Sequence, residues 1–125
     1  MDDASRCPCG TGETYGNCCG PLHAGAPALT AERLMRSRYS AFVVGDAEYL
    51  LRSWHPSTRP DRLELDPAQR WLHLEIVDRR GGGLFDRDGE VEFIATFRLD
   101  GRRHELRERS GFVRDGAGWA YVTAV

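Results

Sequence analysis

The sequence contains no lysine, since all 17 of its basic residues are arginines. Catalysis through a lysine Schiff base and a lysine phosphate clamp are therefore excluded. Its apolar runs fall far short of the ~18 residues that span a membrane. The formal net charge is −2, and the basic stretch "RRHELRER" is interrupted by glutamates. Nucleic acid and membrane surfaces are therefore not expected as partners.

Cysteine is missing from residue 20 onward, and the four cysteines are Cys7, Cys9, Cys18 and Cys19. The acidic start "MDDASR" is unlike a signal peptide, so we expect a cytoplasmic protein with reduced thiols. Two disulfides are disfavoured in such a reducing compartment. They are also disfavoured because adjacent Cys18 and Cys19 point in divergent directions. A redox-active pair normally has C-x-x-C spacing, which is absent. Four clustered thiols favour a tetrahedral zinc site over both alternatives.

The predicted zinc site is closed. Four sulfur ligands fill the tetrahedron and leave no position for water, so the ion is expected to be structural. Gly10 and Gly12 permit positive φ angles, which predicts that backbone amides turn toward the sulfurs. His23 is a less favoured replacement ligand, because four thiolates already suffice.

The stretch "CPCGTGETYGNCCG", residues 7–20, resembles the SEC-C motif, the zinc-binding tail of the bacterial preprotein translocase motor. All four cysteines match the motif at its spacing. In the motor the motif binds zinc and contacts a partner chaperone, and it recurs on many unrelated bacterial proteins. The resemblance therefore implies Zn²⁺ and a protein contact, without identifying the partner.

The chain divides into three predicted parts: a zinc knuckle over 1–20, a linker over 21–29 and a folded domain over 30–125. Pro21 and Pro27 are expected to prevent regular structure in the linker.

Two helices are predicted at the start of the domain. Thr30 is a candidate N-cap, and the helix that follows is expected to end at Gly45. Asp46 begins a second helix, which ends at His55-Pro56. Residues at helical spacing give the first helix an amphipathic face, comprising Leu34, Met35, Arg38, Tyr39, Phe42 and Val43.

From residue 72 the apolar period changes to two. Strands are predicted over 72–76, 91–99, 104–112 and 119–125, with a hairpin turn at 100–102. Helices followed by an antiparallel meander indicate an α+β fold. Glu108 and Ser110 share a strand face with Leu106 and Phe112, so two polar side chains are expected to point into the core. Their candidate partners are Tyr39, Arg38 and residues 53–59.

The stretches "RSRYSAF" (36–42), "SWHPSTR" (53–59) and "ERSGFVRDGAGWAY" (108–121) resemble the YchJ-type family of bacterial proteins. With the cysteine motif, the resemblance covers nearly the whole chain. It implies a fold like nuclear transport factor 2 (NTF2), in which helices close a cone of curved antiparallel sheet. Some members carry a second cysteine motif, which this sequence does not contain.

A pocket inside the predicted cone is the second candidate site. Its predicted residues are Tyr39, Trp54, His55, Arg59, Glu108 and Ser110. His55 is a candidate general base oriented by Glu108, or a helix-terminal side chain with a structural hydrogen bond. Arg59 either holds an anionic ligand or pairs with a nearby carboxylate.

Two functions follow from these sites. The preferred hypothesis is a binding or adaptor module without catalysis, in which the zinc knuckle contacts a protein and the pocket holds a small ligand. The alternative is a small acid-base enzyme, hydrolase-like or isomerase-like, that uses His55 with Glu108 or Tyr39. Pairing of two chains into a homodimer is a further hypothesis, because sheets of this fold often pair.

Overall fold

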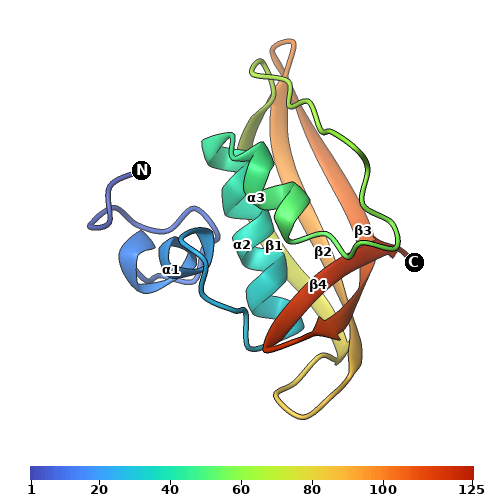
Figure 1. Ribbon diagram of the computed structural model, residues 1–125. Helices are drawn as coiled ribbons and strands as arrows, with labels where there is room; N and C mark the ends of the chain where they lie inside the picture. The colour runs from blue at the N-terminus through green and yellow to red at the C-terminus, as the bar shows by residue number, and fades with distance from the viewer.

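Helix α2 (Ala31–Val44) lies between a curved sheet and the N-terminal segment (Figure 1). The computed structural model describes all 125 residues. A short 3-10 helix η1 (Tyr15–Asn17) and helix α1 (Cys19–His23) precede α2, and helix α3 (Ala47–Arg52) follows it. Strands β1 (Arg70–Gly81), β2 (Asp88–Leu99), β3 (Arg102–Asp115) and β4 (Gly118–Ala124) complete the chain.

The helix boundaries follow from local capping. The Thr30 hydroxyl accepts a hydrogen bond from the Arg33 amide at 3.1 Å, and Gly45 ends α2 with a φ of 79°. The Asp46 carboxylate then accepts from the Tyr49 amide at 2.9 Å and begins α3. These side-chain and glycine caps satisfy backbone groups that a helix end leaves free, and they confirm the predicted starts of both helices.

The four strands form an antiparallel sheet in the order β1-β2-β3-β4. Register irregularities interrupt the β1–β2 pairing twice and the β3–β4 pairing once, and such bulges bend a sheet. Figure 1 shows the sheet curving around α2 and α3. The predicted α+β cone of helices on a four-stranded meander is confirmed.

The predicted linker differs from the structure at its start, because α1 extends from Cys19 to His23. Pro21 is the third residue of this helix, within the first turn, where the backbone amides lack helical partners in any case. A proline there costs no hydrogen bond, so the prediction that it prevents regular structure is wrong.

One hydrophobic cluster contains the cysteines, α2 and the sheet. It includes all four cysteines together with Leu34 of α2, and Phe93 and Phe112 of the sheet. The division at residues 20 and 29 stays a prediction, but the parts on either side of it share this core. No helix has the length and apolarity needed to cross a membrane.

Candidate metal centre and cavity

The four cysteines lie together and are buried. Their sulfur atoms are all within 4.8 Å of one another, and those of Cys9 and Cys18 are 3.6 Å apart. Four sulfurs at ~2.3 Å from a tetrahedral ion would be about 3.8 Å apart. The cysteines are free thiols rather than disulfides. The cluster therefore has the size and the donor chemistry of a four-sulfur metal site.

A tight loop presents the first two sulfurs. The Cys7 amide donates to the Glu13 carbonyl at 2.9 Å, and the Gly10 amide donates to the Cys7 carbonyl at 3.3 Å. Gly10 and Gly12 have φ angles of 84° and 93°, which confirms the predicted need for glycine. The Gly10 amide serves the loop backbone, whereas the Thr11 backbone contributes to the lowered pKa of the Cys9 thiol.

Two hydroxyl groups also contact the sulfurs. The Thr11 hydroxyl lies 3.2 Å from the Cys18 sulfur and 3.6 Å from that of Cys9. The Ser40 hydroxyl, from α2, lies 3.3 Å from the Cys19 sulfur and 3.6 Å from that of Cys7. Each hydroxyl thus contacts one of the first two cysteines and one of the adjacent pair Cys18 and Cys19. Groups in such positions orient metal ligands and spread their charge.

The electrostatics of the thiols also suit a cation. A hydrogen bond from Cys19 lowers the pKa of the Cys9 thiol to about 4. Hydrogen bonding to Cys9 and burial raise the pKa of Cys19, and burial raises that of Cys18. Neighbouring buried thiols cannot all ionise without a compensating charge, and a divalent cation supplies it.

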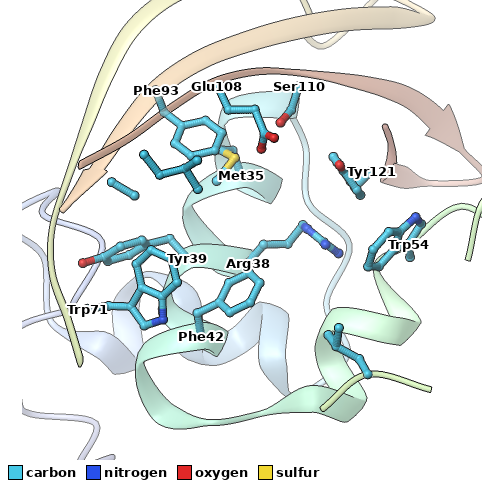
Figure 2. A pocket seen from close by; sticks show the side chains of 13 residues that line it. Met35, Arg38, Tyr39, Phe42, Trp54, Trp71, Phe93, Glu108, Ser110 and Tyr121 are labelled. Carbon is cyan, nitrogen blue, oxygen red and sulfur yellow. The ribbon is translucent and has the colours of Figure 1, made fainter. Parts of the chain in front are cut away.

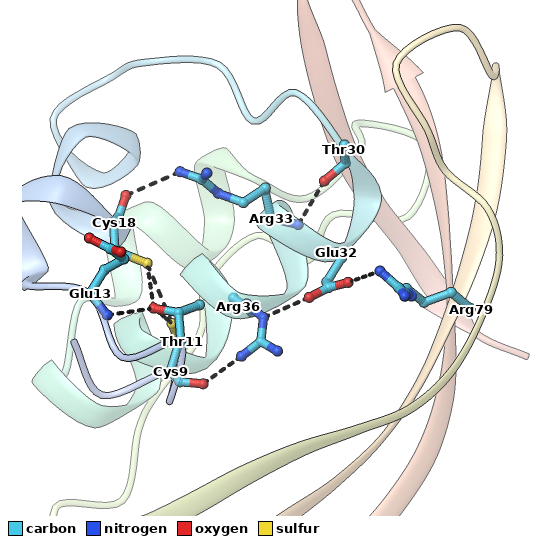
Figure 3. A network of polar contacts seen from close by, with 9 residues as sticks. All are labelled: Cys9, Thr11, Glu13, Cys18, Thr30, Glu32, Arg33, Arg36 and Arg79. Atoms are coloured by element: carbon cyan, nitrogen blue, oxygen red, sulfur yellow. Dashed lines mark hydrogen bonds and ion pairs between the residues drawn. The ribbon is translucent and has the colours of Figure 1, made fainter.

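A chain of polar contacts joins the cluster to α2 and to the sheet (Figure 3). The Arg36 guanidinium donates to the Cys9 carbonyl at 2.7 Å and to the Glu32 carboxylate at 2.8 Å. Glu32 also pairs with Arg79 of β1. Burial alone would raise the pKa of Glu32, but hydrogen bonds and charge from the two arginines lower it.

His23 is not a metal ligand in this structure. Its Nε2 atom lies 2.8 Å from the Ser37 carbonyl, and its Nδ1 atom lies 2.6 Å from the Tyr15 hydroxyl. A carbonyl can only accept, so Nε2 carries a proton and Nδ1 is left to accept from the tyrosine. His23 therefore connects η1 and α1 to α2.

The opposite side of α2 lines a cavity of about 300 Å³ (Figure 2). Its walls come from α2, the segment after α3, the segment before β1, and all four strands. Ten of the 13 lining residues are hydrophobic, which makes the cavity suited to an apolar molecule. The aromatic members are Tyr39, Phe42, Trp54, Trp71, Phe93 and Tyr121.

Four of the six predicted pocket residues line this cavity, namely Tyr39, Trp54, Glu108 and Ser110. His55 and Arg59 do not. The His55 amide donates to the Tyr121 carbonyl at 2.7 Å, and its ring contacts the Ser57 hydroxyl. The exposed Arg59 side chain donates to the Trp54 carbonyl.

The position of Trp54 explains this difference. Trp54 pairs with Tyr121 in a parallel β-bridge, and successive side chains of extended backbone point to opposite sides. Trp54 faces the cavity, so His55 turns away from it. The predicted pairing of His55 with Glu108 is therefore not formed.

The arginine that lines the cavity is Arg38 and not Arg59. Only 5% of Arg38 is exposed. Its Nη1 atom donates to the Leu50 carbonyl at 2.8 Å and to the Ser53 hydroxyl at 2.6 Å. The guanidinium also lies over the rings of Tyr121 and Trp54, at 4.4 and 5.1 Å. Burial lowers the pKa of Arg38 to about 10, so the side chain is still a cation at neutral pH.

Comparison with known proteins finds separate matches for the cysteine segment and for the domain that follows it. The family model for the YchJ middle NTF2-like domain matches residues 30–124, and the SEC-C motif model matches residues 5–21. A UPF0225 protein of Streptomyces coelicolor is 56% identical over 93% of this chain and 91% of its own length. A UPF0225 protein of Ralstonia nicotianae is 52% identical over 94% and 89%.

Two solved structures are also similar. A SEC-C motif containing protein from Rhodopseudomonas palustris, solved in solution, has a TM-score of 0.83 and 34% identity and covers 95% of this chain and 96% of its own. The crystal structure of a SEC-C motif containing protein from Psychrobacter arcticus has a TM-score of 0.80 and 31% identity, over 98% and 83%.

Proposed function

This chain belongs to the YchJ-like family of SEC-C motif proteins, and on that premise we propose that it is a zinc-stabilised binding module. In this function the cysteine cluster holds one structural Zn²⁺. The cavity on the other side of α2 receives a small ligand and catalyses no reaction on it.

The observation that carries the zinc proposal is the closed set of four buried sulfurs within 4.8 Å of one another. An all-thiolate set favours zinc over the hard cations Mg²⁺ and Ca²⁺. Bound zinc would cross-link the N-terminal loop to α1. The Ser40 hydroxyl extends this cross-link to α2, since it contacts the sulfurs of both Cys7 and Cys19.

Helix α2 supports the proposal that the two sites form one module. Ser40 faces the sulfurs, whereas Arg38 and Tyr39, two and one residues earlier, line the cavity. Zinc binding is therefore expected to hold in place the helix that forms one wall of the cavity.

The acid-base alternative lacks its central pair, because His55 lies outside the cavity lining. Burial raises the pKa of Tyr39 to about 12. A phenol with so high a pKa is a poor general base near neutral pH. No contact in the structure favours catalysis over binding.

Protein contact through the SEC-C segment and pairing into a homodimer are further parts of the proposal. The first is supported only by the use of the motif in the translocase motor. Sedimentation velocity over a range of concentrations tests the second, and a constant monomer mass would remove it.

Elemental analysis tests the metal proposal. Protein purified without chelators is expected to contain one zinc per chain, and Cys18→Ser is expected to lose most of it. Ser57→Ala, which removes a hydroxyl far from the sulfurs, serves as the control and should keep the full stoichiometry. Zinc near zero in the parent protein, with its thiols reduced, would refute the proposal.

A further inference from the structure

We propose that the cavity binds a small apolar molecule with one carboxylate group and that Arg38 is the anchor of that carboxylate. The inference rests on the proposed function, in which the cavity receives a ligand, and it adds the chemical class of the ligand.

Arg38 is a buried cation without an anionic partner. None of the ion pairs in the structure includes it. A charge removed from water is costly unless an opposite charge or several hydrogen bonds compensate it. Two neutral oxygens and two aromatic rings provide part of that compensation.

The unused part of the guanidinium opens into the cavity. Only Nη1 of Arg38 has hydrogen-bond partners in the protein, which leaves Nη2 and Nε without any. Every fully enclosed side-chain nitrogen or oxygen in the structure has a partner, so these two donors must border the open space. Adjacent guanidinium donors are the arrangement that binds a carboxylate through both oxygens.

Ser110 gives a second, independent indication. It is only 2% exposed and lines the same cavity, yet its hydroxyl has no hydrogen-bond partner in the protein. By the same reasoning that hydroxyl also faces the open space. A buried polar group normally has a partner, and a ligand oxygen would provide one.

The rest of the cavity sets the size and character of the ligand. A dry cavity of about 150 Å³ holds benzene, so twice that volume corresponds to about 12 non-hydrogen atoms. The cavity here measures about 300 Å³ and is walled mainly by hydrophobic residues. An aromatic or branched aliphatic body would therefore fill it, with the acid group directed at Arg38.

Glu108 limits the charge of the ligand. It lines the cavity beside Ser110 (Figure 2), and no ion pair joins it to Arg38. The field of Glu108 reaches this end of the cavity, because its charge contributes to the raised pKa of Tyr121, which burial dominates. A second negative charge near Arg38 would be repelled, so the site suits one carboxylate and opposes di- and triphosphates.

A matched pair of probes tests the inference. 3-Phenylpropionate and the neutral 3-phenylpropanamide have the same shape and number of non-hydrogen atoms, and Trp54 and Trp71 in the cavity wall report binding by fluorescence. The zinc-loaded protein is expected to bind the acid about tenfold more tightly than the amide. Ser110→Ala should weaken acid binding, and Arg38→Gln should abolish the preference for the acid.

Glu108→Gln keeps the test valid if Arg38→Gln misfolds. Removing the repelling charge should increase affinity for the acid several-fold and leave the amide unchanged, a gain that a folding defect cannot produce. Equal binding of acid and amide by the parent protein would overturn the inference and leave the proposed small-molecule site standing. Failure of both probes to bind zinc-loaded protein would overturn the inference and leave the metal proposal standing.

Discussion

Replacing Ser40 by alanine removes a hydroxyl contact between α2 and the proposed metal site while changing a single atom of the side chain. The Ser40 side chain is fully buried, and its hydroxyl lies 3.3 Å from the Cys19 sulfur and 3.6 Å from that of Cys7. Ser40→Ala removes this oxygen and its proton and leaves all four metal ligands in place. The change therefore tests whether the helix stabilises the bound metal.

The expected loss of zinc affinity follows from these two contacts. A hydroxyl has one proton, so it donates to one sulfur at a time and two full hydrogen bonds should not be counted. A hydrogen bond to a charged acceptor contributes about 1.5–3 kcal/mol. That range corresponds to about 10- to 150-fold in zinc affinity, and losing a group that orients a metal ligand usually costs about 10- to 100-fold.

Competition with a chromophoric zinc chelator measures this affinity, and Ser37→Ala is the matched control. Ser37 lies on the same helix and is also fully buried, but its hydroxyl bonds to the Leu34 carbonyl and the Tyr49 hydroxyl. Ser37→Ala should lower the melting temperature with little change in zinc affinity. If both variants weaken zinc equally, the loss reflects general destabilisation, and the assigned role of Ser40 is wrong.

Three other perturbations have defined outcomes. Removing zinc with a strong chelator should make all four thiols reactive toward a thiol reagent and lower the melting temperature, and zinc should restore both; unchanged thiol reactivity would contradict a metal site. Glu32→Gln should cost about 0.5–1 kcal/mol at pH 7 in urea denaturation. The lowered pKa of Glu32 stabilises the fold above its ordinary value of 4.5, so the difference between parent and variant should shrink as pH falls below that value; a constant difference would contradict the ion pairs. Gly82→Ala should cost more than Gly116→Ala, because both have positive φ but only at Gly82 would a Cβ lie 2.7 Å from that of Ala31.

The features that the sequence predicts well depend on neighbours in the chain. The spacing of the cysteines predicts that their sulfurs gather, as they do, because two tight turns suffice to bring them together. Thr30, Gly45 and Asp46 mark helix ends through hydrogen bonds that span at most five residues. The alternation from residue 91 to 95 likewise predicts the burial of Val91, Phe93 and Ala95, although it does not predict that of Thr96.

The features that the sequence does not predict depend on contacts between distant segments. Ser40 lies 21 and 33 residues from the two cysteines that it contacts, and no local pattern distinguishes it from Ser37. His55 faces away from the cavity only because Trp54 pairs with Tyr121 of β4. A signal for Arg38 does exist, since this arginine interrupts an apolar helix face, but the pattern fits a surface-directed side chain equally well.

The burial of α2 shows why the metal site and the cavity belong to one structure. Four consecutive residues, 37–40, are all buried, and four residues go once around an α-helix at 3.6 residues per turn. The helix is therefore enclosed at this level, with the cysteine segment on one side and the sheet on the other (Figure 1), and the cavity lies between α2 and the sheet. Without the cysteine segment, the Ser40 hydroxyl would lose its contacts with the Cys7 and Cys19 sulfurs. We therefore expect that a metal bound between Cys7 and Cys19 would also hold Arg38 in place. The affinity of the cavity for an acid would then depend on zinc.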